Sequence, residues 1–204
     1  MVAIDIADAT AERPVIDATL RCIARFGVGK TTLDDVAAEA RCSRATVYRL
    51  FPGGKDRLLE AVVLHEAARF AAGLRDAVAG IDDVEELLVA GVGYAARHLK
   101  HHDALQFLLA YEPELILPLI CFRQLDVLLA IATDLAGPHL APYVGEDEAA
   151  RAGEWLARIV VSYLVAPSSG FDLTDPDSVH RLVRAHVLPG LAPFLRGEHH
   201  HVVH

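Results

Sequence analysis

Apolar residues recur at helical spacing along almost the whole chain, and this pattern constrains the fold more than any other sequence feature. In the clearest stretch, Val84 to Leu99, apolar side chains recur at i, i+3, i+4 and i+7 over four turns. Alternation of apolar and polar residues, the signal of a half-buried strand, is nearly absent. The pattern predicts an all-α protein of about nine helices, and 204 residues suffice to bury a substantial core.

The first quarter of the chain predicts three helices. The first begins at Pro14 and ends at Gly27, since proline suits the first helical position and glycine ends a helix. Thr32 is a suitable N-cap for a second helix over residues 33–40. A third helix, residues 44–51, follows after a short turn. Two short helices joined in this way and preceded by a packing helix predict a helix-turn-helix.

The rest of the chain predicts longer helices. They are expected over residues 55–79, 84–99, 103–111, 114–135, 146–166 and 176–195, with a bend near Pro118, a loop over residues 137–145 and a kink at Pro189. We expect an N-terminal helix-turn-helix domain over residues 1–54, a C-terminal helical domain for ligand binding and dimerisation over residues 55–196, and a disordered His-rich tail over residues 197–204.

A short basic segment stands out in an acidic chain. The net charge is −9, yet Arg41, Arg44, Arg49 and Lys55 lie between Glu39 and Asp56 with no acidic residue among them. A local cluster of cations favours a polyanion site there. The alternative, an ordinary solvated helix face, explains the charges alone equally well.

The third predicted helix carries different residues on its two faces. Val47, Leu50 and Phe51 supply apolar anchors, whereas hydrogen-bond donors occupy the remaining surface: Ser43, Arg44, Thr46, Tyr48 and Arg49. A helix that enters the major groove of DNA needs short or forked polar side chains near its N-terminus and phosphate-binding groups around it. Because the basic segment falls on this helix, the sequence predicts DNA binding.

At these residues the chain resembles the TetR family of bacterial helix-turn-helix transcriptional regulators. The resemblance is carried by residues 31–37 (TTLDDVA) and 43–55 (SRATVYRLFPGGK), and it extends over about residues 12–65. It implies a cytoplasmic repressor that binds an inverted-repeat operator as a homodimer and is released by a hydrophobic small molecule. It also implies that the third helix contacts bases and that Thr32, Tyr48 and Lys55 contact phosphates. The full predicted DNA-binding set is Thr32, Ser43, Arg44, Ala45, Thr46, Tyr48, Arg49 and Lys55.

The chain departs from the family pattern at two places. Arg41 occupies the turn position that is usually glycine, so we expect backbone strain if that turn needs a positive φ. The pair Gly53-Gly54 lengthens the usual junction before Lys55 by one residue. Cys42 follows Arg41 and is expected to be a small core residue rather than a redox switch.

Residues 84–135 are strongly apolar with few polar groups, a composition typical of a binding cavity and equally of an ordinary core. The family resemblance implies a pocket among the fourth to eighth helices. The predicted pocket residues are Tyr94, His98, Gln106, Tyr111, Arg123 and Gln124.

The last two long helices carry apolar stripes that look too broad for one neighbour to cover. We therefore expect a two-fold homodimer in which two helices from each subunit form a four-helix interface. The predicted interface residues are Trp155, Ile159, Tyr163, Leu182, Val183, Val187, Leu191 and Phe194.

An alternative function is a helical-bundle metal-binding protein or enzyme that uses His98, His101 and His102, since His98 and His102 share one helix face. No nucleophile elbow, phosphate loop or zinc-protease motif is present, so we expect no enzyme, cofactor or metal. The longest apolar run, Leu115 to Phe122, is far too short to span a membrane. Three widely spaced cysteines indicate reduced thiols in the cytoplasm.

Overall fold

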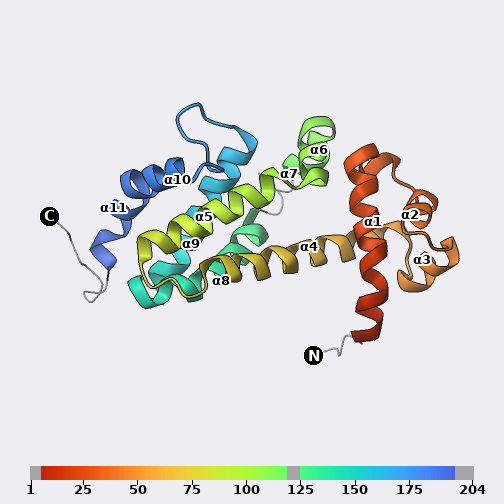
Figure 1. The fold of residues 1–204 in the computed structure, drawn as a ribbon, viewed down its shortest axis with the longest axis horizontal. Coiled ribbons are helices and arrows are strands. Elements are labelled where there is room, and N and C mark those ends of the chain that lie inside the picture. Colours follow the sequence, from red (N-terminus) through yellow and green to blue (C-terminus); the bar gives the residue numbers. More distant parts are fainter. Residues whose placement is uncertain (1–5, 119–124, 196–204) are drawn as a thin grey trace. The chain divides into compact units, whose positions relative to one another are not determined.

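The structure, a computed structural model, describes residues 6–118 and 125–195, and no strand occurs in these two ranges. The all-α prediction is therefore confirmed (Figure 1). The chain forms two compact units. Unit 1 comprises residues 1–69 and 102–116, and unit 2 comprises residues 70–101 and 117–204. The functional boundary that the sequence predicts after residue 54 stays a prediction, because these units reflect packing alone.

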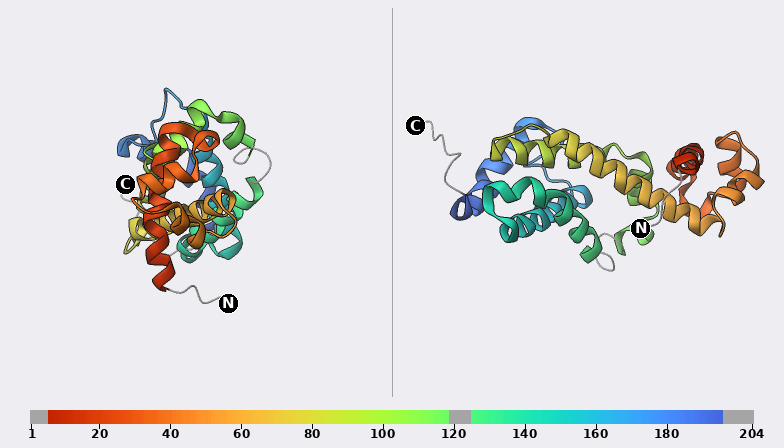
Figure 2. Two further views of the ribbon diagram at one scale, coloured as in Figure 1. Left: turned by 90° about the vertical axis from the view of Figure 1, so that its right-hand side faces the viewer. Right: turned by 90° about the horizontal axis from the view of Figure 1, so that it is seen from below.

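Unit 1 contains the helix-turn-helix. Its helices are α1 (Ile6–Lys30), α2 (Leu33–Glu39), α3 (Arg44–Leu50), the first part of α4 (Lys55–Val78), α6 (Asp103–Tyr111) and the beginning of α7 (Pro113–Pro118). Figure 2 (right) shows α1 almost end-on, with α2 and α3 beside it. The three N-terminal helices enclose a core that includes Val15, Val36, Val47, Phe51 and Leu58.

The first helix begins earlier than the sequence predicts. It starts at Ile6, and Pro14 lies inside it. An internal proline removes one backbone hydrogen bond and normally breaks a helix. Here the next turn buries Val15, Ile16 and other apolar side chains in the unit 1 core, so packing outweighs this local penalty. The predicted break at Gly27 is confirmed, because Gly27 has φ 82° and ψ 169°, outside the helical region.

Unit 2 is a helical bundle built around one core. Its helices are the rest of α4, α5 (Val84–Lys100), α8 (Leu125–Val144), α9 (Glu146–Val165), α10 (Pro176–Leu182) and α11 (Leu188–Leu191). The helices α8 and α9 lie side by side (Figures 1 and 2). None of the described helices is long and apolar enough to cross a membrane.

The predicted loop over residues 137–145 is wrong. α8 continues through Pro138 and Pro142 to Val144, and the chain turns only at Gly145, which has φ 88°. Leu140, Tyr143 and Val144 are buried in the unit 2 core, and this burial holds the helix together in spite of both prolines. Within the helix expected over residues 114–135, the structure describes α7 and the beginning of α8, and residues 119–124 lie outside the described ranges.

The last helix, in which the sequence predicts a kink at Pro189, is irregular over the residues just before that proline. A π-helical turn over Val183–Val187 separates α10 from α11, and a 3₁₀ turn over Ala192–Phe194 follows. Proline cannot donate a backbone hydrogen bond, and its ring crowds the preceding turn. The wider π turn accommodates that crowding.

Candidate nucleic-acid interface

The third helix, α3, sorts its side chains by face as the sequence predicts. Val47 is completely buried in the unit 1 core, and Leu50 packs against that core. Thr46 is half-buried, whereas the other predicted α3 residues are exposed: Ser43, Arg44, Ala45, Tyr48 and Arg49. One face of α3 therefore presents hydroxyl, guanidinium and phenol groups to solvent.

The two caps of the helix-turn-helix fix the start of each helix. Ser43 is the N-cap of α3, and its Oγ accepts a hydrogen bond from the Thr46 amide at 3.0 Å. Thr32 is the N-cap of α2, where it forms a reciprocal capping box with Asp35. The Thr32 hydroxyl donates to Asp35 Oδ2 at 2.6 Å, and the Thr32 amide donates to the same atom at 2.9 Å. These hydrogen bonds lower the pKa of Asp35.

Arg44 is held in place by two neighbours. Its Nη1 donates to Asp34 Oδ2 at 3.0 Å, and its guanidinium lies over the Tyr48 ring at 5.5 Å from the ring centre. Both partners raise the pKa of Arg44. A guanidinium that is oriented in advance loses less side-chain entropy when it binds a base edge or a phosphate.

Lys55 contacts backbone inside unit 1. Its Nζ donates to the Val28 carbonyl oxygen at 2.6 Å, in a partly buried position. The same Val28 residue donates its amide hydrogen to Glu112 Oε2 at 2.8 Å. Sequence reasoning missed Glu112 because nothing in the pattern around Pro113 predicts that α6 returns to the end of α1. An ammonium group has two further donors, so the Val28 contact leaves Lys55 able to bind a phosphate as well.

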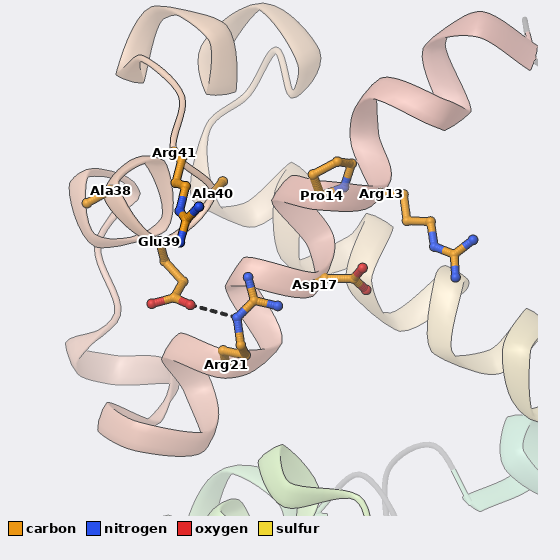
Figure 3. A pocket seen from close by; sticks show the side chains of 8 residues that line it. All are labelled: Arg13, Pro14, Asp17, Arg21, Ala38, Glu39, Ala40 and Arg41. Carbon is orange, nitrogen blue, oxygen red and sulfur yellow. Dashed lines mark hydrogen bonds and ion pairs between the residues drawn. The ribbon is translucent and has the colours of Figure 1, made fainter.

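Arg41 has a positive φ of 55°, so the strain that the sequence predicts at this turn is confirmed. Arg41 lines an open hollow of about 690 Å³ together with Arg13, Pro14, Asp17, Arg21, Ala38, Glu39 and Ala40 (Figure 3). Across it, Arg21 Nε donates to Glu39 Oε1 at 2.6 Å, which lowers the pKa of Glu39. This ion pair ties α1 to α2. Cys42 packs against the unit 1 core, as expected.

The predicted ligand-pocket residues fall in different places. In unit 2, the Tyr94 hydroxyl lies 3.2 Å from His98 Nδ1, and the Phe70 ring contacts the Tyr94 ring at a tilt and the His98 ring edge-on. In unit 1, Gln106 and Tyr111 line a shallow hollow between α1 and α6. Arg123, Gln124 and also Cys121 lie outside the described residues.

The three histidines of the alternative metal site have separate partners. His98 Nδ1 faces the Tyr94 hydroxyl, and His101 Nδ1 lies 2.8 Å from the Arg97 carbonyl. His102 Nε2 lies 2.9 Å from Glu66 Oε2, while its Nδ1 accepts from the Leu105 amide. Within residues 6–118 and 125–195, no three His, Cys, Asp or Glu side chains gather in a way that fits a metal ion.

Half of the predicted dimer residues are buried by their own chain. Leu182, Val183, Val187 and Leu191 belong to the unit 2 core, so they are not available to a partner in this conformation. The stripe looked too broad for one neighbour, but α10 and the π turn both pack against α5. Ile159 and Tyr163 are half-buried against the same core, whereas Trp155 is 43% exposed and Phe194 is 45% exposed.

The two short capped helices and the exposed polar face of α3 have the arrangement of a helix-turn-helix DNA-binding domain. Residues 15–62 match the family model "Bacterial regulatory proteins, tetR family". Residues 15–62 are thus similar to the DNA-binding domain of the TetR family, a family of DNA-binding transcriptional regulators rather than enzymes.

Solved structures share the fold over nearly the whole chain. The TetR family repressor AlkX from Dietzia sp., implicated in biodegradation of n-alkanes, is 25% identical with a TM-score of 0.64, and the match covers 90% of this chain and 96% of AlkX. A putative TetR-family regulator from Mesorhizobium loti is 17% identical with a TM-score of 0.64, covering 94% of this chain and 100% of that one. The fatty acid degradation regulator FadR from Bacillus halodurans is 22% identical with a TM-score of 0.59, covering 87% and 96%. No curated protein matches the sequence.

Proposed function

We propose that the chain is a homodimeric repressor that binds an inverted-repeat operator through α3. The observation that carries this proposal is the exposed polar face of α3, on which Ser43, Arg44, Tyr48 and Arg49 surround the buried Val47 anchor. Arg44 and Thr46 would contact bases, and Thr32, Tyr48, Arg49 and Lys55 would contact phosphates. Such a protein works in the cytoplasm, where the operator is found.

A homodimer explains how a protein with one short recognition helix per chain binds DNA tightly enough. Two recognition helices related by a two-fold axis require two half-sites in inverted orientation. The exposed apolar side chains of Trp155, on α9, and Phe194, after α11, support an interface formed by the C-terminal helices of unit 2. The remaining predicted interface residues act inside the subunit.

A hydrophobic small molecule is the proposed effector. AlkX, with a fold match over 96% of its length, is described as a repressor implicated in n-alkane biodegradation. In this chain, the apolar segment of residues 84–135 contains the Tyr94–His98 pair, which offers a polar anchor within apolar surroundings. Long-chain n-alkanes and their carboxylates are the first compounds to test.

The DNA-binding part is tested by selecting duplexes from genomic fragments with the full-length protein. We expect an inverted repeat, and an affinity that falls steeply with salt because phosphate contacts release counterions. Arg44→Ala should cost on the order of 1–3 kcal/mol and relax one base position. Arg75→Ala, an exposed arginine on α4 in unit 2, is the control and should change little. Binding to no genomic fragment, or binding that is independent of salt, contradicts the proposal.

A further inference from the structure

Val28, directly after the kink in α1, has both backbone polar groups bonded to side chains from distant parts of the chain. Its amide donates to Glu112 Oε2 at 2.8 Å, and its carbonyl accepts from Lys55 Nζ at 2.6 Å. Both contacts are partly buried, so losing either partner leaves a polar group with little access to water. Val28 is thus a junction between α1, the start of α4 and the end of α6.

Gly27 creates this junction. Its φ of 82° turns the Val28 amide away from the helix hydrogen-bond ladder and toward Glu112. A Cβ atom at position 27 would lie only 2.6 Å from Glu112 Cδ, so the absent side chain makes room for the carboxylate. Backbone amides at a positive-φ turn form a concavity that favours an anion. Here the anion is supplied by the protein itself.

The junction lies at the base of the helix-turn-helix. Residue 28 precedes α2 and Lys55 follows α3, so their contact closes the segment that contains both helices. The Gly27 carbonyl also accepts hydrogen bonds from the Thr31 amide at 3.2 Å and the Thr31 hydroxyl at 2.6 Å. Thr32, the next residue, is the N-cap of α2. The backbone conformation at Gly27 therefore determines where the first residues of α2 lie.

We propose that Glu112 is a positioning residue for DNA binding, because its carboxylate, seated against Gly27 and Val28, fixes the direction in which the helix-turn-helix leaves α1. The inference rests on the proposed function and deepens it. It adds a residue far outside the matched region 15–62, from the segment 102–116 that packs within unit 1.

Charge alone predicts the opposite effect, and this makes the proposal testable. Removing a carboxylate from a DNA-binding unit weakens its repulsion from phosphates and raises affinity for every duplex. Removing a positioning contact instead lowers affinity for the operator and leaves scrambled DNA unaffected or better bound. Glu114, two residues further on and exposed, carries the same charge, so Glu114→Ala measures the charge effect alone.

The experiment compares full-length wild type, Glu112→Ala, Glu112→Gln and Glu114→Ala. Each is titrated with the operator selected by the wild type and with a scrambled duplex of equal length. Glu112→Ala should lower the operator-to-scrambled affinity ratio about tenfold, as expected for losing a partly buried hydrogen bond to a charged group. Its Val28 amide should exchange with solvent at least about tenfold faster by NMR. Glu112→Gln keeps an acceptor oxygen and should restore most of both properties.

The outcomes separate the two proposals. Equal affinity ratios for Glu112→Ala and Glu114→Ala overturn the positioning role, as does a Val28 amide that stays protected without Glu112. If Glu112→Ala does not fold, Glu112→Gln is the variant that tests the inference. The inference is overturned if Glu112→Gln loses the operator-to-scrambled affinity ratio of the wild type while its Val28 amide stays protected from exchange with solvent. If the wild type selects no DNA, the proposed function fails, while Val28 exchange still tests the contact itself.

Discussion

Asp35 shows how one side chain couples a helix cap to pH. Its carboxylate accepts hydrogen bonds from the hydroxyl and amide of Thr32, which lower its pKa below the ordinary value of 3.8. A carboxyl whose pKa is lower in the folded state stabilises the fold above its unfolded-state pKa. That stabilisation is lost as the pH falls through the folded-state pKa.

We therefore expect Asp35→Asn to destabilise the protein at neutral pH and to matter less in acid. The difference in melting temperature from wild type should be largest near about pH 6 and should shrink below about pH 3. Thermal unfolding at a series of pH values measures this. Thr32→Ala removes the hydroxyl that donates to Asp35, so its loss of melting temperature should likewise be smaller in acid. A difference that is constant across pH contradicts the assigned cause.

Arg41 carries the one positive φ among the described non-glycine residues. A side chain in this left-handed region costs about 1–2 kcal/mol, partly offset in glycine by the greater entropy of its unfolded chain. Arg41→Gly should therefore stabilise the protein by up to about 1 kcal/mol in urea unfolding. Arg49→Gly, at a helical position in the last turn of α3, is the contrast and should destabilise the protein. A destabilised Arg41→Gly variant would show that the Arg41 side chain contributes more than its backbone costs.

Among the helices, the kink in α1 is the most sharply constrained element. Alanine at position 27 meets both a positive φ and the Glu112 carboxylate. We expect Gly27→Ala to destabilise unit 1 by roughly 1–3 kcal/mol, the usual cost of such a strained position. Gly29→Ala is the matched control, because its Cβ would lie an ordinary 3.6 Å from Glu112 Oε1. Equal unfolding free energies for both variants would contradict this account.

The sequence predicted the helices whose first residue is set by a neighbouring N-cap side chain. The caps Thr32, Ser43 and Asp175 all lie where the sequence indicates a helix start, and their side chains accept the expected amide hydrogens. The strained turn at Arg41 was predictable for the same reason. α8 was not, because two prolines suggest a loop and only burial against neighbouring helices overrides them.

In the candidate site, too, some residues were predictable from local sequence and others were not. The exposed face of α3 follows from helical spacing, so its donors were predictable. Lys55 and Glu112 meet at Val28 only through tertiary packing, across 27 and 84 positions of sequence. Leu182, Val183, Val187 and Leu191, which the sequence predicts at a dimer interface, are buried in the unit 2 core, because an apolar stripe does not reveal whether its own chain or a partner covers it.

For the whole chain, the proposed interface predicts that an added charge has different effects at exposed and at buried apolar residues of unit 2. Trp155→Glu and Phe194→Glu place charges on exposed apolar side chains, so the subunit should stay folded while its dimer dissociates. Each change occurs twice in a two-fold interface, and dimer affinity should fall by on the order of 100-fold. Leu182→Glu buries a charge in the unit 2 core and should instead unfold the subunit.

Analytical ultracentrifugation and circular dichroism separate these results. Val63→Glu, at an exposed apolar position on α4 in unit 1, controls for the added charge and should remain dimeric. A Trp155→Glu Phe194→Glu double variant that stays fully dimeric would place the interface elsewhere. A monomeric double variant should also lose tight binding to the inverted repeat, because a single recognition helix then contacts a single half-site.

If a hydrophobic effector releases the protein from DNA, effector binding and DNA binding must weaken each other. A dimer binds two half-sites at once only when its recognition helices are separated by about one turn of DNA, roughly 34–36 Å. An effector that favours another spacing binds the DNA-free dimer more tightly, and DNA must then weaken effector binding by the same factor. Long-chain n-alkanes or their carboxylates that raise the melting temperature should lower operator affinity about 5- to 150-fold. Calorimetric titration in both orders should return equal factors. Compounds that stabilise the protein yet leave operator affinity unchanged are not inducers, and if all of them behave so, release by a hydrophobic molecule is wrong while DNA binding stands.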